Sequence, residues 1–225
     1  HFAGLKAVGE SVADPLRYWD VNVCGSRALL TAMDAHACRT LVFSSTSTVY
    51  GEPNSFPLTE TTPSAPIHPY AQTKLAVEQM LSALAARGDW RVSALRYFNP
   101  VGAHPSGQIG EDPLGIPNNL FPFITQVAAG RRQRLRIFGN DYPTPDGTGI
   151  RDYLHVMDLA EAHGSALDHL FKRQASDPLT LNIGTGSGLS VLDVVHGFEQ
   201  ATGLATPYEI VERRPGDVPR LEACP

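Results

Sequence analysis

The sequence predicts an α/β fold built around a doubly wound parallel sheet, and two observations carry this prediction. First, short apolar runs alternate with longer helical segments, so that residues 1–98 follow a β-α-β-α-β pattern. Second, the connections are short, and helices that join successive strands place those strands parallel in one sheet. Beyond residue 99 the alternation loosens. We therefore expect a smaller α/β part to follow the sheet.

The first helix has a clear start signal. Asp14 can cap a helix and Pro15 suits its first turn, so we expect a helix from there to about His36. Apolar patterning and breakers such as Gly88 and Gly130 define the elements that follow. In chain order these are a strand at 40–45, a helix at 69–87, a strand at 91–98, a helix at 120–129, a strand at 135–138, a helix at 156–171, a helix ending near 203 and a strand at 208–211.

The composition limits the class of protein. The 225 residues are 42% hydrophobic and 18% charged, which is typical of a globular chain with a sizeable core. A net charge of −5 argues against nucleic acid as the main partner, because a phosphate backbone attracts a basic face. No apolar run is long enough to span a bilayer, so we expect no membrane partner. Cys24, Cys38 and Cys224 form no CxxC motif, and we expect small core residues in a reducing compartment.

Tyr70 and Lys74 stand four residues apart in PYAQTK and so share one face of the predicted helix. An ammonium beside a phenol favours the phenolate, which would lower the pKa of Tyr70 from about 10 towards neutrality. Such a phenolate is a good general base for a sugar or alcohol hydroxyl. Two ordinary residues on a helix surface give the same spacing by chance, so the pair carries little weight alone.

A second polar cluster adds to that pair. The stretch FSSTSTVYG follows the strand predicted at 40–45, and ligands bind at the carboxyl edge of a parallel sheet. There Thr46 could hydrogen-bond the substrate oxygen that Tyr70 deprotonates. The alternative is a Ser/Thr-rich turn without function. The loop at 100–118 is also long for a compact domain, and loops of that length usually have a function.

Three motifs in order, SSTSTVYG, PYAQTK and LRYFNPVGAHP, resemble the extended short-chain dehydrogenase/reductase superfamily. Longer segments narrow the resemblance to the UDP-glucose (UDP-galactose) 4-epimerases: HFAGLKAVGES, NPVGAHPSGQIGEDPLGIPNNL, IFGNDYPTPDGTGIRDYLHVMDLAEAH and RRPGD. These segments cover nearly the whole chain. The resemblance implies a Rossmann-type domain that binds NAD, and reversible C4 epimerisation of UDP-glucose and UDP-galactose in galactose metabolism.

The resemblance also implies roles for single residues. Tyr70 would take the proton of the sugar 4-hydroxyl while NAD takes the hydride from C4, and the 4-keto intermediate would turn over before the hydride returns. Lys74 would hold the nicotinamide ribose. Thr46 stands where these enzymes usually carry Ser, and it keeps the hydroxyl. The implied cofactor contacts are Phe2, Ala3, Gly4, Leu5, Lys6, Thr46, Tyr70, Lys74 and Phe98.

The implied substrate contacts would grip the UDP part, because a rotating keto sugar needs loose contacts. Arg151 and Arg214 suit the diphosphate, since the guanidinium fork matches phosphate oxygens. The implied substrate-binding set is Thr48, Asn99, Asn118, Asn119, Leu120, Arg136, Ile137, Phe138, Arg151, Arg214 and Asp217. No metal is expected, because the histidines fit no ligand motif and suit loop or capping roles instead: His68, His104 and His155.

The chain departs from the family pattern in several places. The Gly-rich turn that holds the dinucleotide should precede His1, and the GTGSG at 184–188 lies too late to replace it. We therefore expect a fragment, truncated at both ends, that is inactive alone. Val21 stands where an Asn usually lies near the cofactor. Leu221 stands where a Tyr or a small residue lies near the sugar 2-substituent, which predicts some tolerance of N-acetylated UDP-sugars.

The expected division is a partial NAD-binding domain at 1–99 and a mostly nucleotide-sugar-binding part at 100–225. Segments near 139–185 are expected to return to the first domain. The family implies a cytoplasmic homodimer, often paired through the helix that carries Tyr70 and the helix before the strand at 40–45.

Two alternatives stay open. A nucleotide-sugar 4,6-dehydratase, or another extended short-chain dehydrogenase, would share Thr46 and the Tyr-Lys spacing. The dehydratases usually carry Asp-Glu after the Thr, where this chain has Ser47 and Thr48. A non-catalytic nucleotide-sugar-binding protein could also use the fold, although the joint presence of Tyr70, Lys74 and the Thr46 hydroxyl argues against it.

Overall fold

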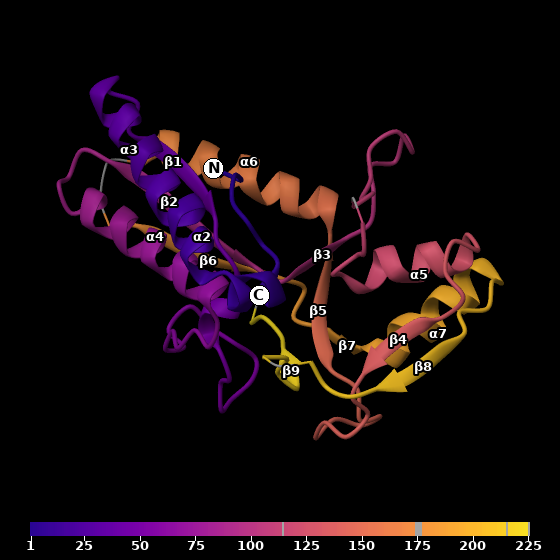
Figure 1. The fold of residues 1–225 in the computed structure, drawn as a ribbon. Coiled ribbons are helices and arrows are strands. Elements are labelled where there is room, and N and C mark those ends of the chain that lie inside the picture. The colour runs from indigo at the N-terminus through magenta and orange to yellow at the C-terminus, as the bar shows by residue number, and fades with distance from the viewer. Residues whose placement is uncertain (114, 174–176, 215, 225) are drawn as a thin grey trace.

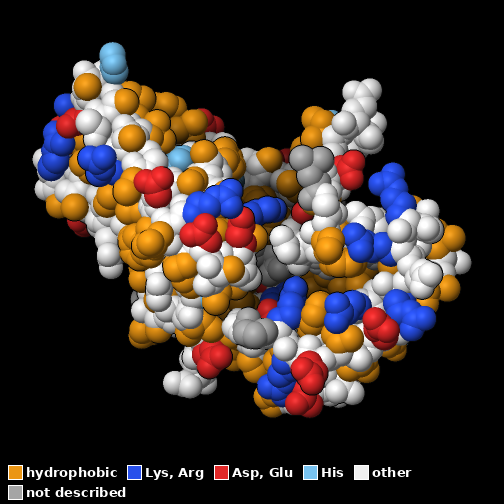
Figure 2. All heavy atoms as spheres, viewed as in Figure 1, with side chains coloured by type: hydrophobic (Ala, Val, Ile, Leu, Met, Phe, Trp, Pro, Cys, Tyr) orange, Lys and Arg blue, Asp and Glu red, His pale blue; other side chains and the backbone are white. Residues whose placement is uncertain are grey.

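The computed structural model describes residues 1–113, 115–173, 177–214 and 216–224. Figure 1 shows two parts: a sheet with helices on both sides, and a smaller part that carries α5 and α7. Strands β3 and β5 lie between the two parts. Figure 2 shows the surface hollowed between them, with Lys and Arg side chains along the hollow.

The larger sheet has the parallel order β1-β2-β6, with β1 at Thr40–Ser44, β2 at Arg91–Tyr97 and β6 at Leu179–Ile183. The interior residues of β1 and β2 are buried without interruption, as expected for strands covered on both faces. Phe43 pairs with Ala94, and Leu95 pairs with Leu181. The expected parallel α/β sheet is therefore confirmed.

Helices cover both faces of this sheet. On one face, α3 (Gly25–Ala35) and α4 (Pro69–Ala85) bury Leu30, Val77 and Leu81 against Phe43 and Val92. On the other face, α6 (Val156–Lys172) packs its Ala166 and Leu170 against Val42 and Leu95. The helices predicted at 69–87 and 156–171 are thus confirmed within two residues at each end.

The first residues form no strand, so the β element expected at the start of the chain is wrong. His1 nevertheless lies against the edge of β1: its amino group donates to the Val42 carbonyl at 2.8 Å, and its carbonyl accepts from the Ser44 amide at 3.2 Å. A short helix that the sequence did not predict, α1 (Val8–Ala13), follows this contact.

The helix expected from Asp14 to His36 exists but is not uniform. Asp14 caps it by accepting a hydrogen bond from the Arg17 amide, and α2 (Pro15–Tyr18) leads into η1, a π-helix over Trp19–Cys24, and then into α3. The expectation that the cysteines lie in the core is wrong. Cys24 and Cys38 are exposed and Cys224 is half-buried, because the first ends the π-helix and the second lies in the turn after α3.

The smaller part contains two further groups of strands. Strand β5 (Ile150–His155) pairs parallel with β3 (Asn99–Val101) and β9 (Arg220–Leu221), and antiparallel with β7 (Gly188–Ser190). Strand β4 (Leu135–Phe138) pairs parallel with β8 (Tyr208–Val211) and packs on α5 (Leu120–Ala128) and α7 (Val191–Thr202). The sequence predicted β4, β8, α5 and α7 but missed β3, β5, β7 and β9.

The connections bring the two parts together. Strand β5 runs directly into α6, which returns the chain to the larger sheet, and β6 is followed by β7 beside β5. Thr46 follows the carboxyl end of β1, and Phe98 follows the carboxyl end of β2. Among the described helices, none has both the length and the apolar character needed to cross a membrane.

Candidate functional site

The turn after β1 carries the predicted hydroxyl. Thr46 caps the short 3-10 helix η2 (Ser47–Tyr50), because its Oγ1 accepts a hydrogen bond from the Thr48 amide at 3.2 Å. The Thr46 and Thr48 hydroxyls lie 3.0 Å apart. Thr46 is only 6% exposed, so its hydroxyl faces the interior at the carboxyl end of the sheet.

Helix α4 carries Tyr70 and Lys74 into the same place. Its start is fixed by Pro69 in the first turn and by His68, whose Nδ1 accepts from the Ala71 amide at 3.2 Å. Tyr70 and Lys74 are 8% and 6% exposed, so the alternative of a surface pair is wrong. Lys74 Nζ donates to the Ser44 carbonyl at 3.0 Å, and it lies 5.9 Å from the centre of the Tyr70 ring.

Burial dominates the protonation of both groups. It lowers the pKa of the Lys74 ammonium to about 8. It raises the pKa of the Tyr70 phenol well above its usual value, while a hydrogen bond with the Thr46 hydroxyl acts in the opposite direction. The expectation that Lys74 draws the Tyr70 pKa towards neutrality is therefore wrong for this chain alone, because the desolvation of the phenolate outweighs the ammonium.

The segment of Phe2, Ala3 and Gly4 runs past this pair and is exposed. A Cβ added to Gly4 would lie 3.0 Å from Asn22 Oδ1 and 3.7 Å from Lys74 Nζ, so a larger residue here would crowd Asn22 beside the ammonium. Asn22 binds the backbone of Leu5, the residue after Gly4. Its Oδ1 accepts from the Leu5 amide at 2.8 Å, and its Nδ2 donates to the Leu5 carbonyl at 3.0 Å.

Two further residues of the expected cofactor set differ in their surroundings. Phe98 is 4% exposed and packs in a cluster with Tyr50 and Leu221, directly after β2. Lys6 is exposed, and its Nζ lies 4.0 Å from the Glu111 carboxylate in the long loop. Val21 is exposed and Asn22 is buried, so the polar contact near this segment comes from Asn22.

A second group, which we call the arginine cluster, consists of Arg151, Arg214, Asp217 and Phe138. Arg214 Nε donates to the Asp217 carboxylate at 2.9 Å, and its guanidinium lies 4.5 Å from the centre of the Phe138 ring. Arg151 Nη1 donates to the Ile150 carbonyl at 2.8 Å. Burial lowers the pKa of Arg151, and the nearby Arg214 charge lowers it further while Asp217 raises it. Both guanidinium groups are cations, and together they would attract an anion.

The remaining predicted substrate residues do not form one cluster. Ile137 is 2% exposed in the core of the smaller part, so only its backbone could contact a ligand. Asn118 and Asn119 are exposed, and Asn119 Nδ2 donates to the Glu111 carboxylate at 3.0 Å. Leu120 opens α5, and Asn99 opens β3 and is half-buried.

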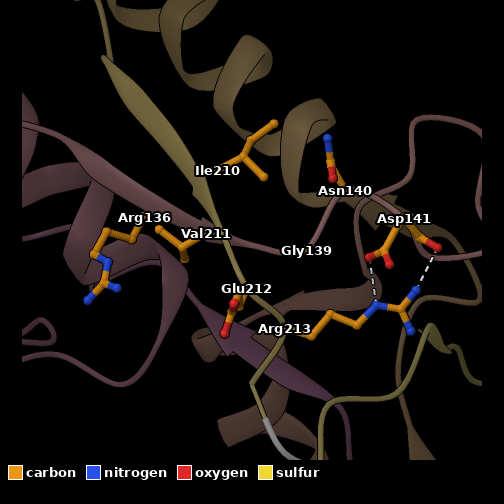
Figure 3. A pocket seen from close by; sticks show the side chains of 8 residues that line it. All are labelled: Arg136, Gly139, Asn140, Asp141, Ile210, Val211, Glu212 and Arg213. Atoms are coloured by element: carbon orange, nitrogen blue, oxygen red, sulfur yellow. Dashed lines mark hydrogen bonds and ion pairs between the residues drawn. The ribbon is translucent and has the colours of Figure 1, made fainter.

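Arg136 lies at an open hollow of about 730 Å³ at the β4–β8 edge. Figure 3 shows Arg136 and Arg213 on different sides of this hollow, with Arg213 turned towards Asp141. Arg213 Nε donates to Asp141 Oδ1 at 2.7 Å. The Arg136 guanidinium also lies 5.6 Å from the centre of the Phe138 ring, so it borders the arginine cluster as well as the hollow.

Sequence reasoning missed three residues near these groups. Among the described residues, the Tyr142 hydroxyl is buried without a hydrogen-bond partner, and the Arg213 guanidinium lies 4.1 Å from its ring centre. Burial raises the pKa of Tyr153 to about 12, against the charges of Arg151 and Arg214. His163 Nε2 is hydrogen-bonded to the Ser44 hydroxyl at 2.8 Å. No local motif marks these residues, because each is brought to its place by the tertiary fold.

The histidines that invited a metal interpretation have the expected local roles. His68 and His155 cap α4 and α6, and the His104 ring accepts from the Ser106 amide at 3.2 Å.

Comparison with known proteins identifies the relatives of this chain. Residues 1–184 match the family described as the NAD dependent epimerase/dehydratase family. The chain is 54% identical to a UDP-glucose 4-epimerase of Bacillus subtilis over 226 aligned residues and 100% of this chain, and 54% identical to UDP-glucose 4-epimerase 2 of Oryza sativa over the same share. It spans 66% and 55% of the lengths of these two relatives.

Among solved structures, the chain is also similar to UDP-glucose 4-epimerases. One is a UDP-glucose 4-epimerase of Stenotrophomonas maltophila with bound NAD and formylated UDP-arabinopyranose, with a TM-score of 0.95, 53% identity, and coverage of 99% of this chain and 66% of that chain. Another is a UDP-glucose 4-epimerase of Bifidobacterium longum in complex with NAD+ and UDP. The TM-score is 0.94 and the identity is 48%, and the match covers 100% of this chain and 67% of that chain. By its sequence and by its fold, the chain belongs to the NAD-dependent epimerase/dehydratase family.

Proposed function

We propose that the protein containing this chain interconverts UDP-glucose and UDP-galactose by C4 epimerisation through a transient 4-keto sugar, with NAD as its bound cofactor. The observation that carries the proposal is the convergence of Tyr70, Lys74 and the Thr46 hydroxyl in one buried place at the carboxyl end of the sheet. The names of the relatives at 54% identity support the reaction, and the NAD and UDP in the solved relatives support the ligands.

The residues around Lys74 fit a dinucleotide. An ammonium has three protons to donate, and the Ser44 carbonyl accepts one, so the others are available to the ribose hydroxyls of a dinucleotide bound beside Gly4. When bound, NAD supplies the hydride acceptor and a positive charge on its nicotinamide ring. The residues that would hold it are Phe2, Ala3, Gly4, Leu5, Lys6, Thr46, Tyr70, Lys74 and Phe98.

Tyr70 is the proposed base at the sugar 4-hydroxyl. Burial holds its pKa high in the chain alone, so it needs a cation beside the ring to become a phenolate at neutral pH. The Thr46 hydroxyl favours the phenolate by its hydrogen bond and is placed to contact the same sugar oxygen. Lys74, whose pKa is about 8, still carries most of its charge at pH 7 and adds to the same effect.

The arginine cluster is the proposed grip for the UDP diphosphate, because charged guanidinium groups bind phosphate oxygens firmly. A firm hold at the diphosphate leaves the sugar free to turn. The other proposed substrate contacts are Thr48, Asn99, Asn118, Asn119, Leu120, Arg136 and the backbone of Ile137.

Residues 1–99 are proposed as part of the NAD-binding domain and 100–225 as mostly nucleotide-sugar-binding, with segments near 139–185 shared with the first domain. We also propose a cytoplasmic homodimer. Its support is an exposed apolar face on α1, α2 and η1, where Val12 is 61% and Leu16 is 79% exposed, and free cysteines among the described residues. Analytical ultracentrifugation of the full-length protein would decide between monomer and dimer.

The test is a Tyr70→Phe variant of the full-length protein, assayed for conversion of UDP-galactose to UDP-glucose. Loss of a general base is expected to lower kcat by about 10²-fold or more, while bound NAD and thermal stability stay near those of the unmodified protein. Equal conversion by both proteins would remove Tyr70 from the reaction. Absence of conversion by the unmodified full-length protein would overturn the proposed function itself.

A further inference from the structure

A buried ion pair joins the helix of Tyr70 to the neighbouring strand. Glu78 lies on α4, one turn after Lys74, and Arg96 lies near the end of β2. Their side chains are 8% and 9% exposed. Arg96 Nε lies 3.1 and 3.2 Å from the two Glu78 oxygens, and Arg96 Nη2 donates to Oε2 at 2.6 Å. Such a bidentate pair fixes the orientation of both side chains.

The ion pair also contacts the turn that carries Thr46. The Ser45 hydroxyl donates to Glu78 Oε1, and the Ser45 amide donates to the Leu95 carbonyl at 2.9 Å. Ser45 is completely buried and directly precedes Thr46. Its hydroxyl therefore connects the Thr46 backbone to the same helix that carries Tyr70.

Tyr50, at the other end of the turn, contacts Arg96 of the same ion pair. The Arg96 guanidinium lies 5.0 Å from the centre of the Tyr50 ring, and the Tyr50 hydroxyl donates to Asn182 Oδ1 at 2.7 Å. Ser45, two residues before η2, thus contacts Glu78, and Tyr50, the last residue of η2, contacts Arg96. A charge pair with this many partners resists displacement, because moving either group would leave the other buried and unpaired.

We propose that the Glu78–Arg96 pair is an anchor for the turn over residues 45–50, and that Ser45 is a positioning residue that holds the Thr46 hydroxyl against Tyr70. The inference rests on the proposed function, in which Tyr70 must become a phenolate. Neither Ser45, Glu78 nor Arg96 belongs to the cofactor and substrate contacts proposed above, so their effect is exerted through Thr46.

The consequence for Tyr70 follows from its surroundings. Burial and the nearby Tyr97 and Tyr18 raise the Tyr70 pKa, whereas the Thr46 hydroxyl lowers it. A turn that is free to move would carry the Thr46 hydroxyl away from the phenol, and the Tyr70 pKa would rise. The other groups that face the phenol are Lys74, 5.9 Å from its ring centre, and the His68 ring, 6.0 Å away.

The test is Ser45→Ala in the full-length protein. This change removes the hydroxyl and keeps the ion pair. Ser93→Ala is a matched control, because Ser93 is equally buried in the adjacent strand and its hydroxyl has no hydrogen-bond partner among the described residues. Two measurements are made: amide hydrogen exchange of the peptide spanning residues 44–50, and the pH profile of kcat with UDP-galactose.

Ser45→Ala is expected to speed exchange in this peptide and to move the acid limb of the kcat profile about one pH unit higher. Below that limb kcat falls about tenfold, while KM changes by less than about twofold. Ser93→Ala leaves both measurements unchanged. Unchanged exchange in Ser45→Ala overturns the anchor, and faster exchange with an unshifted acid limb overturns the positioning role. If the unmodified protein has no epimerase activity, the proposed function fails, and the exchange comparison still decides on the anchor.

Discussion

At the scale of single residues, the sequence predicts which groups meet but not how they are protonated. The four-residue spacing correctly places Tyr70 and Lys74 on one side of α4, since helical periodicity is a local property. It gives no measure of burial, and burial is what raises the Tyr70 pKa and lowers the Lys74 pKa to about 8. Tyr142, Tyr153 and His163 escaped prediction for a related reason, because tertiary packing alone brings them to the site.

Lys74 gives a prediction about stability at this scale. Its folded pKa of about 8 lies below the ordinary lysine value of 10.5, so the unfolded chain binds more protons between these two values. The buried ammonium therefore destabilises the folded state below pH 8, and the penalty disappears as the pH rises towards 10.5. Replacing Lys74 by Met should raise the free energy of unfolding at pH 7 by about 1–3 kcal/mol, even though the proposed ribose contact is lost.

Urea unfolding of the full-length protein without added nucleotide measures this difference at pH 7 and again at pH 10, where it should shrink. Lys6→Met is the control, because the Lys6 side chain is 77% exposed. A Lys74→Met protein that is less stable than its parent at both pH values would contradict the account.

At the scale of elements, segments with a clear pattern of their own were predicted, and strands defined by distant partners were missed. Helices α4, α6 and α7 and strands β1, β2, β4 and β8 carry the signal in their own patterning. Strand β5 does not, because Arg151 and Asp152 interrupt its apolar residues and their partners come from distant segments. The π-helix η1 also has no local signature that separates it from the α-helix on either side.

Asp152 explains why the GTGSG turn lies where it does. Its buried carboxylate accepts hydrogen bonds from the Thr185 amide at 2.9 Å, the Gly186 amide at 2.9 Å and the Ala223 amide at 3.2 Å. A Cβ on Gly184 would lie 2.6 Å from the same carboxylate, so the close approach requires glycine. The turn is thus held on β5 by Asp152, and Gly184 allows it to pack there.

Asp152→Asn should therefore destabilise the protein, because the amide cannot accept as many hydrogen bonds as the carboxylate. Hydrogen bonds to a charged group contribute about 1.5–3 kcal/mol each, and we expect a loss of about 2–3 kcal/mol in the free energy of unfolding. Urea unfolding compares the variant with Asp168→Asn, which lies on the exposed face of α6. Equal losses in the two variants would show that Asp152 does not have this role.

At the scale of the whole molecule, the alternation of elements predicts the parallel sheet with helices on both faces, and the structure confirms it. The alternation does not predict how the smaller part is assembled. Strand β5 pairs with β3, β7 and β9, which come from three separate regions of the sequence. Helix α7 and strand β8 lie between β7 and β9 along the chain. Contacts between such distant segments depend on the final fold, and the site at the border of the two parts depends on them.

The proposed reaction also belongs to this scale, because it needs the sheet to hold Tyr70 and the smaller part to hold UDP while the sugar turns. Its central claim is that the hydrogen removed from C4 returns to the same carbon of the same molecule. The direct measurement is conversion of UDP-galactose deuterated at C4 by the full-length protein in ordinary water. The account predicts UDP-glucose that retains deuterium at C4, whereas UDP-glucose with hydrogen from water at C4 would contradict it.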